Sequence, residues 1–97
     1  MASNVSEITI TYEEDGINVI KELDKQVLTS GAWATLMFRY KQWDKAKEVY
    51  SPDRYTIRRY RKRNGEYIQQ SKFNISSKDQ AEKIIESLQK WVAVSDE

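Results

Sequence analysis

The stretch "RYTIRRYRKRNGEYIQQSKFNI", residues 54–75, predicts a β-hairpin around which the rest of the chain can be placed. Two ten-residue arms, 54–63 and 66–75, flank the dipeptide Asn64-Gly65. Both residues of that dipeptide tolerate the positive φ that a two-residue hairpin turn requires. The sequence therefore predicts two antiparallel strands joined by a tight turn.

Side-chain alternation along the first arm separates two sets of residues, because successive side chains of a strand point to opposite faces. Tyr55 and Ile57 form one set. The other set consists of Arg54, Thr56, Arg58, Tyr60 and Lys62. We expect the Tyr55 set to face the core, together with Phe73 and Ile75 of the second arm, and the basic set to face away from it.

Three segments upstream of the hairpin also predict strands. "AWATLMFRYKQW" (32–43) is the clearest, because its even positions from 34 to 40 are all apolar while its odd positions mix aromatic, apolar and basic groups. "EITITY" (7–12) alternates as a half-buried strand does, and the acidic "EEDG" after it predicts a turn. Residues 17–28 fit strand and helix about equally, and we favour a strand because Gly16 and "TSG" bracket them. Residues 1–15 form either an extra strand or an extension, and 44–53 a lysine-bearing loop.

A C-terminal amphipathic helix follows the hairpin. Ser77-x-x-Gln80 is a capping box, in which each side chain satisfies a backbone amide at the start of a helix. Apolar residues then recur at helical spacing at Ala81, Ile84, Ile85, Leu88 and Trp91. The fold class is thus α+β: an antiparallel sheet of four or five strands followed by one long helix, in a single domain spanning 1–97. One helix covers one face of such a sheet, so the other face is solvated, paired with a second subunit or occupied by a ligand.

Composition narrows the function classes. The 97 residues contain no cysteine and no histidine, which removes thiolate chemistry, the commonest general base and the commonest metal ligand. Glu13, Glu14 and Asp15 are interpreted as a solvated turn and not as a metal site, because consecutive carboxylates do not converge on one point. We therefore expect no enzyme activity, no cofactor and no metal. No membrane-spanning run or signal peptide is evident, so the expected location is the cytoplasm, with nucleoid association left open.

Charge is strongly segregated along the chain. Residues 1–24 hold one basic and six acidic side chains, whereas residues 39–63 hold ten basic and three acidic ones. Lysine and arginine interleaved with aromatic rings suit single-stranded nucleic acid, since the cations follow the phosphates and the rings stack on bases. The candidate binding residues are Trp33, Arg39, Lys41, Trp43, Lys45, Lys47, Arg54, Arg58, Tyr60 and Lys62. A solvated basic hairpin, or a module whose basic face binds an acidic protein segment, remains the alternative.

The stretch "TIRRYRKRNGEYIQQSKFNISSKDQAEKIIESLQKWV" resembles the C-terminal half of the transcriptional positive cofactor four family of single-stranded DNA-binding proteins. Ile57, Arg58 and Tyr60 match its Asp-Ile-Arg-Glu-Tyr-Trp strand, and "FNIS" (73–76) matches the short strand before its helix. "VLTSGAWATL" (27–36) resembles the strand-turn-strand of bacterial relatives. Two positions depart from the motif: Arg59 replaces its acidic residue and Arg61 its terminal tryptophan.

The resemblance implies a curved sheet and a homodimer joined through the helices, with single-stranded DNA lying across the sheets. It places Ile84, Leu88 and Trp91 in the dimer interface and Arg58 on the DNA backbone. Trp43 with Lys45 and Lys47 would correspond to the aromatic residue and lysines of the family's central hairpin. With a tryptophan absent from position 61, Tyr60 or Trp43 is expected to supply the stacking ring. Neither a membrane nor a small-molecule substrate is expected as a partner.

Overall fold

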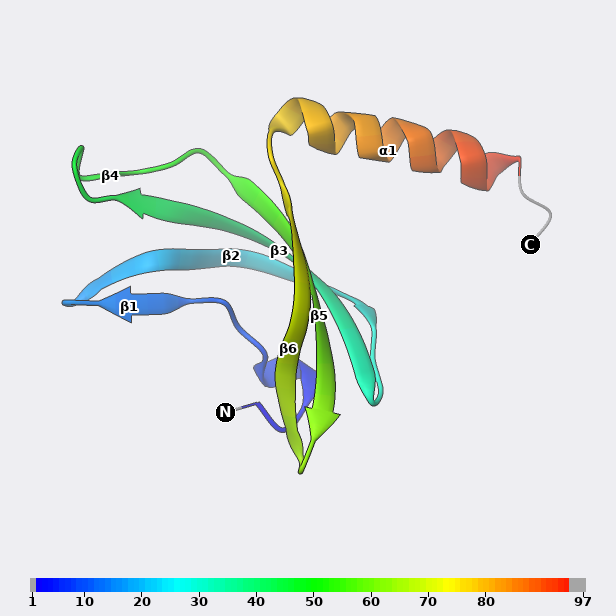
Figure 1. The fold of residues 1–97 in the computed structure, drawn as a ribbon. Helices are drawn as coiled ribbons and strands as arrows, with labels where there is room; N and C mark the ends of the chain where they lie inside the picture. The colour runs from blue at the N-terminus through cyan, green and yellow to red at the C-terminus, as the bar shows by residue number, and fades with distance from the viewer. Residues whose placement is uncertain (1, 95–97) are drawn as a thin grey trace.

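The computed structural model describes residues 2–94, and it consists of a curled antiparallel sheet and one C-terminal helix (Figure 1). A short 3-10 turn, Val5–Glu7, precedes the sheet. The strands are β1 (Tyr12–Glu14), β2 (Ile17–Thr29), β3 (Trp33–Asp44), β4 (Val49–Tyr50), β5 (Arg54–Arg63) and β6 (Glu66–Ile75), and the helix is α1 (Lys78–Ala93). The sheet order is β1-β2-β3-β5-β6, with β4 paired to β3. The expected α+β class and the order of sheet and helix are confirmed.

The β5–β6 hairpin has the predicted bounds and the predicted turn. Asn64 and Gly65 adopt φ values of 51° and 80°, the conformation for which this dipeptide is favoured. The ambiguous segment 17–28 is a strand, β2, as we favoured. Two register shifts, between Glu22 and Asp24 and between Val27 and Thr29, each insert an extra residue into β2. Such bulges increase local twist and bend a strand, which accounts for part of the curl of the sheet.

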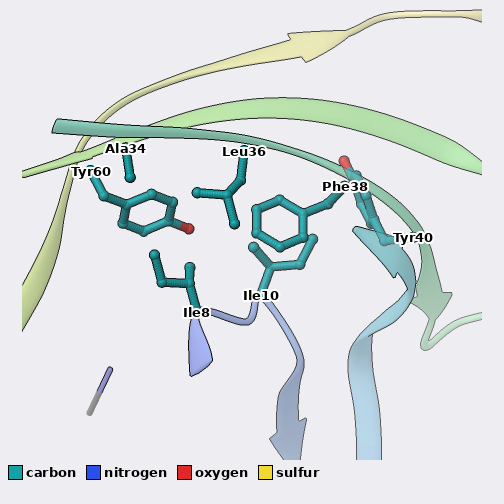
Figure 2. Packing of buried hydrophobic residues seen from close by; sticks show 7 residues of the cluster. All are labelled: Ile8, Ile10, Ala34, Leu36, Phe38, Tyr40 and Tyr60. Carbon is teal, nitrogen blue, oxygen red and sulfur yellow. The ribbon is translucent and has the colours of Figure 1, made fainter. Parts of the chain in front are cut away.

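The core lies on one side of β3 and is closed by the N-terminal segment (Figure 2). Ala34, Leu36 and Phe38 are fully buried, and Ile8 and Ile10 pack over them. Residues 7–12 were expected to form a strand, but pairing with β2 begins only at Tyr12. Ile8 and Ile10 are buried as their alternation predicted, whereas Tyr12 is exposed. We call residues 2–11 the N-terminal strap, and the face of the sheet beneath it the inner face.

Side-chain hydrogen bonds hold the N-terminal strap to β2. The Lys25 ammonium donates to the backbone carbonyls of Ser6 and Ile8, at 2.9 and 2.7 Å. The Glu22 carboxylate accepts from the Thr9 hydroxyl at 2.7 Å and from the Ile10 amide at 3.2 Å. These bonds satisfy polar groups of the strap that have no partner in a neighbouring strand. The strap can therefore cover apolar side chains without leaving its own backbone groups unpaired.

The orientation of β5 is the reverse of our expectation. Tyr60 stands opposite Ala34, and Thr56 stands opposite Phe38. Directly paired residues of antiparallel strands share a face, so the Arg54–Lys62 set lies on the inner face with the core. The outer face instead carries Tyr55, Ile57, Phe73 and Ile75, and Phe73 is 50% exposed there. The alternation is as predicted, but the face assigned to each set was wrong.

The helix α1 begins with the predicted cap. The Ser77 hydroxyl accepts from the Gln80 amide at 3.0 Å, and the Gln80 side chain reaches back to Ser76 rather than to Ser77. However, α1 covers neither face of the sheet; it extends away from the end of β6 and contains no buried residue (Figure 1). The Cα radius of gyration is 15.5 Å, against roughly 12.5 Å for a compact chain of this length. The expectation that the helix covers one sheet face is therefore wrong for a single copy.

Candidate nucleic-acid interface

The outer face of β3 carries a tryptophan near each end. Trp33 and Trp43 are ten residues apart on one strand and share its outer face by alternation. At the usual strand rise this places them on the order of 33 Å apart. Arg39 and Lys41 lie on the same face between them. A strand of this kind can offer rings at both ends and cations in the middle to an extended ligand.

Trp33 forms a cluster with two arginines of β5. It is paired directly with Arg61 and diagonally with Arg59. The guanidinium carbon of Arg59 lies 4.2 Å from the centre of the indole, and that of Arg61 lies 5.2 Å from it. These distances are those of cation–π contacts, which bring the two cations together on one exposed ring.

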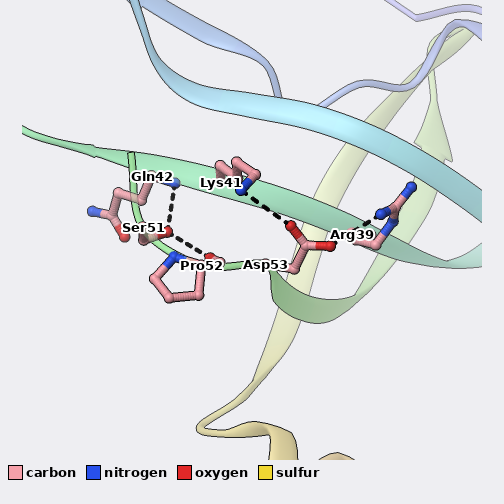
Figure 3. Close-up of polar contacts among 6 residues, drawn as sticks. All are labelled: Arg39, Lys41, Gln42, Ser51, Pro52 and Asp53. Atoms are coloured by element: carbon pink, nitrogen blue, oxygen red, sulfur yellow. Dashed lines mark hydrogen bonds and ion pairs between the residues drawn. The ribbon is translucent and has the colours of Figure 1, made fainter. Parts of the chain in front are cut away.

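The centre of the outer face is an ion-pair cluster around Asp53 (Figure 3). Arg39 Nη1 lies 3.0 Å from one oxygen of this carboxylate, and Lys41 Nζ lies 3.5 Å from the other. The hydrogen bond from Arg39, helped by the charge of Lys41, lowers the pKa of Asp53 below its ordinary value. Asp53 thus partly neutralises the middle of the face and fixes the positions of both cations.

The other end of the candidate interface is an open hollow beside the β3–β4 turn, with a volume of about 600 Å³. Trp43 and Tyr50 meet edge to face there, with ring centres 4.9 Å apart. The Lys21 ammonium lies 5.5 Å from the centre of the Tyr50 ring. Predicted binding residues that line this hollow are Trp43, Lys45, Lys47 and Arg54. Cationic and aromatic side chains therefore surround one concavity large enough for a nucleotide-sized group.

The remaining predicted residues do not share a surface with these. Arg58, Tyr60 and Lys62 follow the inner-face alternation of β5. Tyr60 is only 7% exposed, and burial raises its phenol pKa. It cannot stack on a base while the core is intact. Arg58 Nη1 donates to Gln69 at 3.1 Å, while its Nε is enclosed without a partner. The expectation that Arg54, Arg58, Tyr60 and Lys62 share a face with Trp33, Arg39 and Lys41 is wrong, although Arg54, at the start of β5, reaches the hollow from the inner face.

Several side chains of the candidate interface were not identified from the sequence. Arg59 and Arg61 were passed over because alternation groups them with Tyr55 and Ile57, the set that we expected to face the core. Phe73 was placed in the core, yet it adds an exposed ring to the outer face, beside Ile57 and Met37. Tyr50 gave no signal, because β4 has two residues and its pairing depends on contacts across the hairpin. Lys21 was missed because it lies on β2 and meets the Tyr50 ring only in the folded sheet. If the side of β5 that faces the core had been assigned correctly, alternation would have placed both arginines on the outer face.

Comparisons of this chain with protein-family models, curated proteins and solved structures give no match. Within residues 2–94, no helix is long and apolar enough to cross a membrane. The same residues contain no cluster of three or more acidic side chains placed to hold a metal ion.

Proposed function

We propose that this protein binds single-stranded DNA or RNA with little sequence preference, as a non-enzymatic homodimer that acts in transcription, replication or repair. The observation that carries the proposal is the outer face of β3 and β5, where arginines and lysines lie between the exposed ring of Trp33 at one end and the hollow at Trp43 at the other. Cations along a strand can follow the phosphates, and aromatic rings accept any base. The resemblance to the positive cofactor four family supports the same assignment, and a cytoplasmic or nucleoid location suits it.

The homodimer is proposed on the apolar stripe of α1. Leu88 is 52% exposed and Trp91 is 63% exposed, next to the half-buried Ile84. A helix of 16 residues is only marginally stable by itself, and most helices in proteins owe their stability to packing of an apolar face. No element of the described chain covers this stripe. A second copy presents the same stripe, so one two-fold contact would bury both.

Fluorescence anisotropy of labelled oligo-dT, poly-rU and duplex DNA tests the binding. We expect both single strands to bind more tightly than the duplex, with affinity falling steeply as salt rises, because released counterions drive phosphate contacts. Tryptophan emission should be quenched as bases stack near the hollow. Absence of binding at low salt would overturn the proposal and favour the module that binds an acidic protein segment.

A set of variants locates the interface. Replacing Lys45 and Lys47 with glutamine should weaken oligo-dT binding about tenfold and reduce its salt dependence. Lys83→Gln with Lys90→Gln removes the same charge from α1, away from the outer face of the sheet, and serves as the matched control. Tyr60→Phe should leave affinity unchanged, since Tyr60 is buried. Equal losses in the lysine pair and in its control would show that only net charge matters.

The oligomeric state is tested separately, by sedimentation equilibrium. Leu88→Glu with Trp91→Glu should convert the protein into a monomer, because it places two carboxylates in the buried contact. Gln89→Glu adds a carboxylate beside the stripe and should leave the dimer intact. If the wild-type protein is a monomer at micromolar concentration, the homodimer is refuted, while the proposal of nucleic-acid binding still stands.

A further inference from the structure

The cluster of Trp33, Arg59 and Arg61 differs from the centre of the outer face because, among the described residues, its cations are not paired with a carboxylate. Arg39 and Lys41 share the Asp53 carboxylate. Within residues 2–94, by contrast, neither Arg59 nor Arg61 forms a salt bridge or a side-chain hydrogen bond. Both guanidiniums rest on one indole ring, at 4.2 and 5.2 Å. Two like charges against one ring repel each other, and an anion placed against both relieves that repulsion.

The ring also determines which atoms of the arginines remain available. A guanidinium stacked on an indole uses its flat face, and its N–H groups point outward from its edge. That edge is the fork that binds two oxygens of one phosphate, and a fork already held in place loses less entropy on binding. Both arginines are exposed at this point. The site therefore has the donors, the charge and the preorganisation for a phosphate group.

We propose that Arg59 and Arg61, seated on Trp33, form a phosphodiester-binding site at one end of the interface. The inference rests on the proposed function and goes beyond it by separating the roles of two tryptophans. Trp33 is a positioning residue whose ring carries the arginines, since the Arg59 guanidinium covers the indole at 4.2 Å. Base stacking belongs to the other end, where Trp43 and Tyr50 border the open hollow.

The experiment compares two probes: oligo-dT, and a strand of the same length made of abasic sites, which keeps the phosphates and lacks the bases. Arg59→Gln with Arg61→Gln should weaken both probes by at least about tenfold, because two charge-assisted contacts are lost. The slope of log affinity against log salt should become shallower by about 0.7, the change expected when one phosphate contact on a single strand is lost. Lys83→Gln with Lys90→Gln is again the matched control for net charge.

Two conservative variants test the geometry. Arg59→Lys with Arg61→Lys retains both charges but lacks the planar fork, so affinity should fall while the salt slope changes little. Trp33→Leu should behave in the same way, because it removes the ring against which the two guanidiniums lie and leaves both cations. Circular dichroism of each variant checks whether the sheet is intact.

The outcomes separate this inference from the proposed function. Wild-type protein that binds neither probe would overturn the function itself. Wild-type binding with an unchanged affinity and slope in Arg59→Gln/Arg61→Gln would overturn only the phosphate site. A loss confined to oligo-dT, with abasic binding unaffected, would show that the arginines contact bases, and this too would overturn the phosphate assignment.

Discussion

Trp33 and Arg61 occupy directly opposed positions of the β3–β5 ladder, and the Arg61 guanidinium carbon lies 5.2 Å from the indole centre. The same register places Tyr60 opposite Ala34 in the core. A slip of one residue would exchange the two faces of β5, burying the arginines and exposing Tyr60. The composition of the outer face is thus a direct consequence of how β5 aligns with β3.

The N-terminal strap should contribute substantially to stability, because Ile10 is 7% exposed and packs in the core. We expect Ile10→Ala to lower the free energy of unfolding by about 2–5 kcal/mol, the usual range for truncating a buried isoleucine. Urea denaturation monitored by tryptophan fluorescence measures the change. Ile68→Ala, at a site 48% exposed on β6, is the matched control and should cost much less. Similar costs at the two sites would mean that the strap does not close the core.

Lys25 should anchor the strap through the carbonyls of Ser6 and Ile8. Lys25→Met retains much of the aliphatic length and removes the donor, which should cost about 1–3 kcal/mol because a part-buried carbonyl loses its partner. Hydrogen exchange of the amides of residues 6–10 should accelerate more than that of β5. Uniform acceleration across both segments would point to global destabilisation instead of release of the strap.

Acid should weaken the ion-pair cluster of Asp53. Its pKa is lowered in the folded protein by Arg39 and Lys41, so its contribution to stability is fully present above the ordinary carboxyl pKa of 3.8. That contribution is lost as the pH falls through the lower folded value. We expect the wild type to lose more stability than Asp53→Asn between pH 5 and pH 2, and salt to shrink the difference because the pair is exposed. Parallel pH profiles for the two proteins would contradict the role of Asp53.

The β5–β6 turn should depend on Gly65, whose φ is 80°. Gly65→Ala places a side chain in left-handed backbone, at a cost of about 1–2 kcal/mol. Asn64→Gly keeps a residue that tolerates positive φ and should be nearly neutral. Thermal unfolding of both variants checks the difference. An equal melting temperature for Gly65→Ala and the wild type would show that the turn relaxes to another type.

Local chemistry made much of the fold predictable. The Asn64-Gly65 turn, the ten-residue arms of β5 and β6 and the apolar face of β3 depend on turn geometry and on alternation, which neighbouring residues carry. The Ser77 cap of α1 is equally local. Segregation of charge and the presence of rings among the cations were also visible, and they supported nucleic-acid binding as a hypothesis.

Only the tertiary structure decided which face of β5 meets the core. Both of its side-chain sets contain aromatic residues, so alternation by itself could not distinguish Tyr55 with Ile57 from Thr56 with Tyr60. The register against β3 resolved this, and the N-terminal strap supplied the apolar cover that we had expected from α1. The sequence by itself determined β3, β5, β6 and α1, the Asn64-Gly65 turn and the charge of the chain, because those depend on residues close together. It did not determine β4, which lies within the segment 44–53 that was expected to be a loop, or the position of residues 7–11 outside the sheet. The contact of Trp33 with Arg59 and Arg61 depends on the pairing of strands distant in sequence, and the exposure of α1 depends on how little of the helix touches the sheet; no local pattern encodes either.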